Sequence, residues 1–310
     1  MNAQVQQLIA MMRAAIPPDA PRMWQLPAAE ARARGDAFFG MLNHGGPEMA
    51  ERRDLTVPAR RGAIAARLYV PRNVNATSPG LLYLHGGGFV IGSPDTHDRL
   101  TRELAEGIGA RVLSLHYALA PEHPYPAGLD DCVDTAQWLA REGPRLGIDP
   151  ARLLIGGDSA GANLSAATIL RSRAERASVT FRAALLIYGR FSGEDTASIT
   201  AWGERDLVLS KLVMEWFERQ YVGETPNRRD PYYAPLIGDL RGFPPSILIV
   251  GTLDPLLDDS KLFAAALEKA GVPADLHVYE DGLHAFMQFA VLDMCGEAIA
   301  RTCAFAQRHV

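Results

Sequence analysis

The sequence predicts an α/β fold: a mostly parallel sheet of about eight strands with helices on both faces. Short, nearly continuous apolar runs alternate with segments of helical pattern along most of the 310 residues. Such runs are typical of parallel strands that are buried on both sides. A glycine-flanked serine and a glycine triplet each follow one of these runs directly, where strand-to-helix turns are expected. With 48% apolar and 22% charged residues, the chain has the composition of a globular protein with an ample core.

The expected strands begin with an antiparallel pair. The run 62–70 ends at Pro71, and residues 55–57 are placed to pair with it. The short buried strand 80–84 then leads directly into the glycine triplet. The further expected strands are 111–115, 152–155, 183–188, 246–250 and 274–279. The helices expected between or after them are 98–107, 129–142, 160–173, 259–270 and 296–307.

Two regions interrupt this alternation. Residues 1–50 have a helical tendency but carry several prolines, and residues 190–235 are rich in aromatic side chains. We expect residues 1–50 to form N-terminal cap helices and residues 190–235 to form an inserted cap segment. Residues 51–189 and 236–310 would then form the catalytic domain. A cap would cover the carboxyl ends of the strands, where open α/β sheets bind ligands; ordinary peripheral helices are the alternative.

The bulk properties exclude some classes of partner. A net charge of −5 argues against nucleic acid, which needs a basic binding face. No run approaches 18 uninterrupted apolar residues, so no membrane span is expected, and the first 16 residues lack the pattern of a signal peptide. Cys132, Cys295 and Cys303 show no CxxC spacing, which favours reduced thiols in a cytoplasmic protein. A homodimer is left open by the sequence.

The segment Gly157-Asp158-Ser159-Ala160-Gly161 carries the most information about chemistry. Glycines on both sides of a serine allow a sharp turn that exposes the hydroxyl as a nucleophile. The composition gives roughly 0.1 chance matches to Gly-x-Ser-x-Gly, and the segment 85–88, His-Gly-Gly-Gly, precedes it in the chain. Backbone N–H groups of Gly86 or Gly87 and of Ala160 are the predicted donors to an oxyanion. His85 is expected to fix this loop through a backbone hydrogen bond.

A serine nucleophile needs a histidine base and a carboxylate that orients it. His284 follows the last expected strand, whereas His277 lies within that strand and His309 is the penultimate residue. Asp254 follows the strand 246–250 and precedes a proline, which favours a tight loop. Asp258 and Asp259 are instead expected at the N-cap and first turn of the next helix. We therefore predict a triad of Ser159, Asp254 and His284.

The remaining site predictions concern the pocket and cofactors. The side chains expected to line the substrate pocket are Phe89, Tyr188, Phe191, Trp202 and Phe286. Bulky cap side chains, Trp24 and Trp216 among them, are expected to limit the length of the acyl chain. No His, Cys, Asp or Glu cluster has the spacing of a metal site, and no phosphate-binding glycine loop with its lysine is present. We expect neither a metal nor another cofactor.

With these motifs in this order, the chain resembles the hormone-sensitive-lipase-like (family IV) bacterial esterases. The segments that carry the resemblance are 85–89, 117–126, 157–161, 254–259 and 284–286, and it spans roughly residues 55–305. Within the family, the stretch from Asp230 to Asp259 looks closest to the acetyl esterases. The resemblance implies an α/β-hydrolase fold with a helical cap and a carboxylesterase that acts on short acyl esters without a cofactor. One departure is the turn that begins Gly189-Arg190-Phe191, where relatives often carry a proline-rich turn.

Two other functions stay open at this stage. An amidase, such as an arylformamidase-like hydrolase, shares the architecture, and its leaving nitrogen needs better protonation than an alcohol does. A ligand-binding protein on the same scaffold would need no catalysis, although the retained triad argues against it. For the esterase, we expect a preference for acyl chains of about two to six carbons, since bulky cap side chains would truncate the acyl tunnel while each fitted methylene gains only about 0.8 kcal/mol.

Overall fold

The computed structural model describes residues 1–15, 17, 19–205 and 207–310. These residues contain one eight-stranded sheet of order β1-β2-β4-β3-β5-β6-β7-β8. The strands are β1 (Glu51–Ala59), β2 (Gly62–Val70), β3 (Ser78–Leu84), β4 (Arg111–Leu115), β5 (Ile148–Asp158), β6 (Ala183–Ile187), β7 (Ser246–Leu253) and β8 (Ala274–Leu283). β2 is antiparallel to β1 and β4, and all the other neighbours are parallel. The predicted fold class is confirmed.

Several expected elements differ in extent from the structure; β5, for example, spans Ile148–Asp158 rather than residues 152–155. The antiparallel start is present, but β1 pairs with β2 along its whole length, from Glu51 opposite Val70 to Ala59 opposite Gly62. β8 does not end at residue 279 as predicted; it continues to Leu283, and Leu253 of β7 pairs with that last residue. The next residue, His284, therefore follows the strand with no intervening loop.

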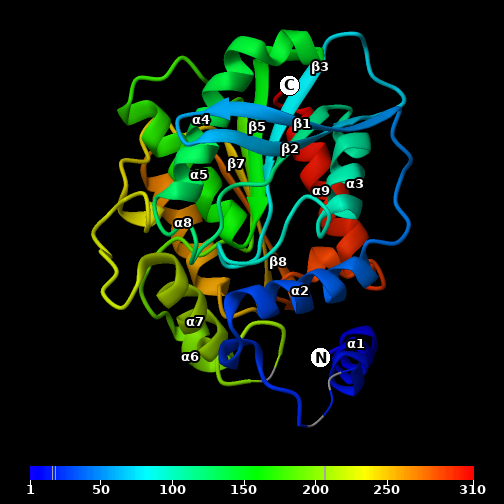
Figure 1. Cartoon of the computed structure of the whole chain (residues 1–310), viewed down its shortest axis with the longest axis vertical. Coiled ribbons are helices and arrows are strands. Elements are labelled where there is room, and N and C mark those ends of the chain that lie inside the picture. Colours follow the sequence, from blue (N-terminus) through cyan, green and yellow to red (C-terminus); the bar gives the residue numbers. More distant parts are fainter. Residues whose placement is uncertain (16, 18, 206) are drawn as a thin grey trace.

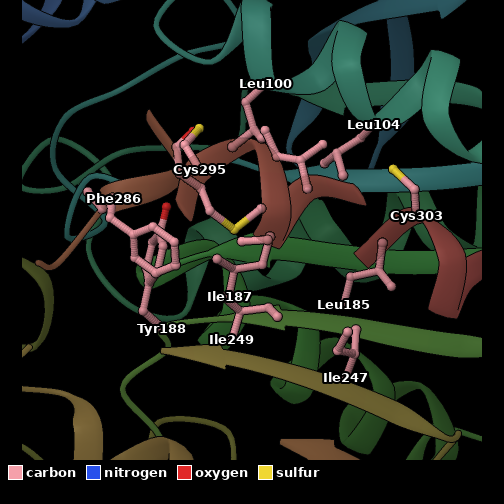
Figure 2. Close-up of a cluster of buried hydrophobic side chains, with 14 of the residues drawn as sticks. Leu100, Leu104, Leu185, Ile187, Tyr188, Ile247, Ile249, Phe286, Cys295 and Cys303 are labelled. Carbon is pink, nitrogen blue, oxygen red and sulfur yellow. The ribbon is translucent and has the colours of Figure 1, made fainter. Parts of the chain in front are cut away.

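Helices cover both faces of the sheet (Figure 1). α3 (Asp98–Ile108) and α9 (Asp293–Gln307) pack on one face, and α4 (Ala127–Glu142), α5 (Ala160–Ala174) and α8 (Leu257–Lys269) on the other. Figure 2 shows the buried layer on the first face, where side chains of α3 and α9 meet those of β6 and β7. Its labelled members include Leu100, Leu104, Leu185, Ile187, Ile247, Ile249 and Cys303. This apolar burial on both faces explains why the strands read as continuous apolar runs.

Four further helices gather at one end of the sheet (Figure 1). They are α1 (Ala3–Ala15), α2 (Ala28–Leu42), α6 (Ala197–Trp202) and α7 (Lys211–Val222). They belong to the two regions that we expect to form a cap. Three residues of those regions, Ile16, Pro18 and Asp206, lie outside the described residues. Within the described part of the chain, every helix is too short or too polar to cross a bilayer.

Candidate active site

The sharpest turn at the site places Ser159 between the end of β5 and the start of α5. Ser159 has φ 54° and ψ −116°, a conformation that non-glycine residues rarely adopt. The flanking glycines permit the turn, because a Cβ on Gly157 or Gly161 would lie 2.1 or 1.8 Å from the Leu84 carbonyl oxygen. The Ser159 N–H donates to the Ile187 carbonyl of the adjacent strand at 2.8 Å. The half-buried serine side chain is thereby held at the carboxyl end of the sheet.

The three side chains that the sequence selects as a triad are hydrogen-bonded in series. Ser159 Oγ lies 2.9 Å from Nε2 of His284, which directly follows β8. His284 Nδ1 lies 3.0 and 2.9 Å from the two carboxylate oxygens of Asp254, which directly follows β7. Asp254 is fully buried and also accepts the Leu256 N–H at 2.8 Å. With Nδ1–H donated to the carboxylate, Nε2 is free to accept a proton from the serine.

Of the two aspartates after Asp254, Asp259 lies in the first turn of α8 as expected, whereas Asp258 does not have its expected position. The N-cap of α8 is Leu256, so the prediction that Asp258 caps this helix is wrong. Asp258 Oδ2 accepts the Ser198 N–H at 2.8 Å and thereby joins α8 to α6. Asp259 Oδ1 accepts the N–H groups of Phe191 and Ser192 at 2.6 and 2.7 Å. Both carboxylates hold the 190–198 segment in place, and neither contacts His284.

The glycine triplet 86–88 forms a loop next to Ser159. The Gly86 N–H already donates to Asp158 Oδ1 at 2.9 Å. No acceptor lies within hydrogen-bond distance of the N–H groups of Gly87, Gly88 and Ala160 among the residues that the structure describes. Gly87 has φ +119°, and a Cβ there would lie 2.1 Å from the Ile91 carbonyl oxygen. Of the three predicted donors, Gly87 and Ala160 are free, Gly86 is engaged, and Gly88 is an additional free donor that the sequence reasoning missed.

A buried polar network supports this loop. Asp158 accepts the Tyr83 hydroxyl at 2.8 Å as well as the Gly86 N–H. Burial alone would raise the pKa of Asp158, but the His97 charge and the hydrogen bonds from His97 and Tyr83 hold it below its ordinary value. Burial lowers the pKa of His85 to about 3, with His97 adding to the effect, so the ring is neutral. Its Nδ1 lies 2.8 Å from the Gly86 carbonyl oxygen, the kind of backbone contact expected for this residue.

A cavity of about 140 Å³ opens over Ser159 and His284. Its walls come from both predicted cap regions and from the glycine loop. The side chains that enclose it are mainly apolar: Met23, Phe39, Phe89, Ile91, Val208, Leu209, Val213, Met214, Phe217, Tyr221, Tyr233 and Leu256. Besides Ser159 and His284, the polar residues that line it are His97, Asp158, Asn163, Arg190, Glu218 and Gln288. The cavity has the largely apolar character of sites that bind small molecules, and its volume is below their usual range of about 300–1,000 Å³.

Of the five aromatic residues predicted to line the pocket, only Phe89 does so. Tyr188 and Phe286 are fully buried in the core between the sheet and α9, where Figure 2 shows them side by side. Tyr188 instead packs edge-on against the His284 ring, with centroids 5.1 Å apart. Phe191 stacks on Phe263 in the core on the opposite face of the sheet, at 4.4 Å.

The predicted cap tryptophans do not reach the cavity either. The Arg205 guanidinium carbon lies over the Trp202 ring, 4.5 Å from the ring centroid. Trp202 lines a separate surface hollow together with residues of α1. Trp216 is buried and is not among the residues that line the cavity, whereas its neighbour Phe217 is. On a helix, adjacent residues point about 100° apart, so a shift of one position changes the face. The apolar spacing Val213, Met214, Phe217 was the signal that could have identified the correct face of α7.

Among the residues that the structure describes, no group of three or more His, Cys, Asp or Glu side chains is arranged so that it could hold a metal ion.

Residues 81–288 of the chain match the model of a protein family that is described as having the α/β-hydrolase fold. Among curated proteins, the chain is similar to an ethyl acetate hydrolase of Pseudomonas putida, with 33% identity over 93% of this chain and 92% of that one. It is also similar to the esterase LipI of Mycobacterium tuberculosis, with 34% identity over 76% and 75% of the two chains. A solved structure of a hyperthermophilic esterase from the archaeon Pyrobaculum calidifontis superimposes with a TM-score of 0.93. That match has 33% identity and covers 99% of this chain and 98% of the other.

Proposed function

Since the chain belongs to the hormone-sensitive-lipase-like family of α/β-hydrolase-fold esterases, we propose that it is a serine carboxylesterase with Ser159 as its nucleophile. The observation that carries the proposal is the hydrogen-bonded series from Ser159 through His284 to Asp254 at the floor of the cavity. The family relatives are esterases, and nothing in the site favours an amidase or a silent ligand-binding protein over them.

In the acylation step, His284 Nε2 takes the proton from Ser159 Oγ as the oxygen attacks the ester carbonyl carbon. The carbonyl oxygen becomes an oxyanion, and the N–H groups of Gly87, Gly88 and Ala160 are the donors that we assign to it. Ala160 also begins α5, whose positive dipole end favours the negative charge. The carbonyl re-forms as the alcohol leaves with the proton from His284. Ser159 then carries the acyl group.

In the deacylation step, His284 removes a proton from a water molecule that attacks the acyl carbon. The second oxyanion collapses, the acid leaves, and the proton returns to Ser159 Oγ. The buried carboxylate of Asp254 orients the imidazole and stabilises its protonated form in both steps. This sequence uses only the residues of the chain and water.

The small cavity supports short acyl esters as substrates. A volume of about 140 Å³ beside Ser159 has room for a short acyl chain and alcohol, and Phe217 narrows it from the side of α7. One relative is named for ethyl acetate, an ester of two carbons on each side. The free, buried thiols of Cys132, Cys295 and Cys303 agree with the cytoplasmic location that we expect.

The proposal is tested by labelling and turnover. Wild-type protein should react with a fluorophosphonate at Ser159 and should hydrolyse 4-nitrophenyl acetate and butyrate. Ser159→Ala should lose the label and lower kcat by about 10⁴-fold or more, with an unchanged circular dichroism spectrum. A folded Ser159→Ala variant that keeps a tenth of the wild-type turnover contradicts the proposal.

A further inference from the structure

Among the residues that the structure describes, the Arg190 side chain lies at the cavity without an ion-pair or hydrogen-bond partner. The carboxylates on the cavity wall have protein partners: Asp158 binds Tyr83 and Gly86, and Glu218 binds Tyr233 and Arg228. Arg190 also lines the cavity, yet no described carboxylate lies within 4.0 Å of its guanidinium. Its Nε is buried and has no hydrogen-bond partner. A buried donor without an acceptor costs free energy, so such a group calls for an explanation.

The backbone of Arg190 is held firmly from two sides. Asn163 Nδ2 donates to the Arg190 carbonyl at 2.7 Å and to the Tyr233 carbonyl at 3.0 Å. Asn163 lies four residues after Ser159, one turn along the helix that begins beside the nucleophile. On the other side, the buried Asp259 carboxylate accepts the next two N–H groups of the chain. The side chain of Arg190 therefore starts from a fixed point relative to Ser159, which reduces the cost of ordering it around a ligand.

A purely structural role for Arg190 is the competing explanation. Burial raises the pKa of Asp259, and the Arg190 charge is among the influences that oppose this rise. The two side chains are nevertheless farther apart than an ion pair, and Asp259 Oδ2 has no hydrogen-bond partner. Arg190 thus stabilises Asp259 only at long range, while its donors stay available on the cavity side.

We propose that Arg190 binds a free carboxylate of the substrate, so that the preferred substrates are short esters that carry a carboxylate at one end. The planar guanidinium fork matches a carboxylate, and the bond between them is charge-assisted. The surrounding wall of Phe89, Val213, Met214 and Phe217 could not hold an anion by itself, because a desolvated charge without a partner is strongly unfavourable. This inference rests on the proposed esterase function.

The carboxylate can belong to the acyl half or to the alcohol half of the ester, and two pairs of substrates separate these sources. The acyl pair is monoethyl glutarate and its neutral monoamide, ethyl glutaramate. The alcohol pair is 3-acetoxypropanoate and 3-acetoxypropanamide. For each pair, a pH-stat assay gives the ratio of kcat/KM for the carboxylate to kcat/KM for the amide. In one pair, this ratio should exceed 1 for the wild-type protein.

Arg190→Gln should lower that ratio by about 10- to 100-fold, the range expected for a lost hydrogen bond to a charged group. Its kcat/KM for the amide should fall much less than its kcat/KM for the carboxylate. Arg205→Gln is the matched control: it removes the same charge from a residue that lies outside the cavity, and it should leave the ratio unchanged. Equal losses on carboxylate and amide, or an unchanged ratio in both pairs, overturn the inference in favour of a structural role.

The wild-type protein supplies a test that does not depend on the folding of a variant. The ratio should fall as KCl is raised from about 0.05 to 0.5 M, because salt screens the attraction between the charges. A ratio below 1 in both pairs at low salt overturns the inference even if the amides are hydrolysed well. If the wild-type protein hydrolyses none of the four esters and Ser159 takes no label, the proposed function itself fails.

Discussion

Phe217 of α7 lies directly against Gly88 of the glycine loop: a Cβ on Gly88 would lie 2.2 Å from Cγ of the phenyl ring. A helix of the region 190–235 therefore touches the loop that we assign to the oxyanion. Phe217 and Gly88 both line the cavity. Gly88, the third glycine of the triplet, is thus required for two reasons: its φ of +59° favours glycine, and a Cβ there would overlap the Phe217 ring.

Phe217→Ala should extend the range of acyl chains. The wild-type protein should prefer chains of about two to six carbons, and each methylene that the variant newly accommodates should gain about 0.8 kcal/mol, or roughly 4-fold in kcat/KM. The measurement is kcat/KM for 4-nitrophenyl esters from acetyl to palmitoyl. Leu212→Ala, an exposed position on the same helix, is the control and should leave the profile unchanged. A wild-type maximum at twelve carbons or longer contradicts the assignment of Phe217 as a limiting wall.

Asp254→Asn should lower kcat by about 10⁴-fold, because an amide can neither fix the His284 tautomer nor stabilise the imidazolium. Asp258→Asn is the matched control, four residues along the same segment. Its carboxylate binds the Ser198 N–H, so the substitution should cost about 1 kcal/mol of unfolding free energy and little activity. Steady-state kinetics with urea unfolding separates the two effects. The triad assignment is wrong if Asp258→Asn is the inactive variant.

Gly87→Ala should lower kcat by about 10²- to 10³-fold, the effect of a lost oxyanion donor, because the loop must move to admit the new Cβ. Gly271→Ala is the control. Gly271 also has a positive φ, +77°, but no atom lies within 4 Å of the position of its Cβ. Gly271→Ala should lose about 1 kcal/mol of stability through backbone strain. Gly87→Ala should lose more, because its Cβ also overlaps the Ile91 carbonyl, and only Gly87→Ala should lose activity. A folded Gly87→Ala variant with wild-type kcat would remove Gly87 from the oxyanion site.

The buried ring of His85 should make the protein less stable in mild acid. Its pKa in the folded state is about 3, below the ordinary value of 6.5, so the unfolded chain binds the proton first as the pH falls. Stability should therefore be full above pH 6.5 and decline between pH 6.5 and pH 3. The contribution of this group at pH 5 is a loss of about 2 kcal/mol relative to pH 7.

Urea unfolding at pH 7 and pH 5 tests this point in the wild-type protein and in His85→Asn. The asparagine amide can still donate to the Gly86 carbonyl but does not titrate. The variant should be less stable than the wild-type protein at pH 7, yet it should lose about 2 kcal/mol less between the two pH values. Equal losses in both proteins would exclude His85 as a source of the acid sensitivity.

The sequence by itself determined the sheet and the residues at its carboxyl end. Apolar runs bounded by glycine and proline mark the strands, and the chemistry follows each strand within a few residues, at Ser159, Asp254 and His284. The carboxyl ends of parallel strands meet at one edge, so local signals were enough to bring these three side chains together. The structure joins them through hydrogen bonds of 2.9 to 3.0 Å.

Only the tertiary structure decided which side chains form the cavity. Phe191 and Arg190 are neighbours in one turn, yet Phe191 packs into the core under the sheet and Arg190 lines the cavity over Ser159. Their directions depend on contacts with Asp259 and Asn163, which are 68 and 27 residues away from them along the chain. The direction of a side chain in an irregular segment depends on such distant partners, and no local pattern in the sequence encodes them.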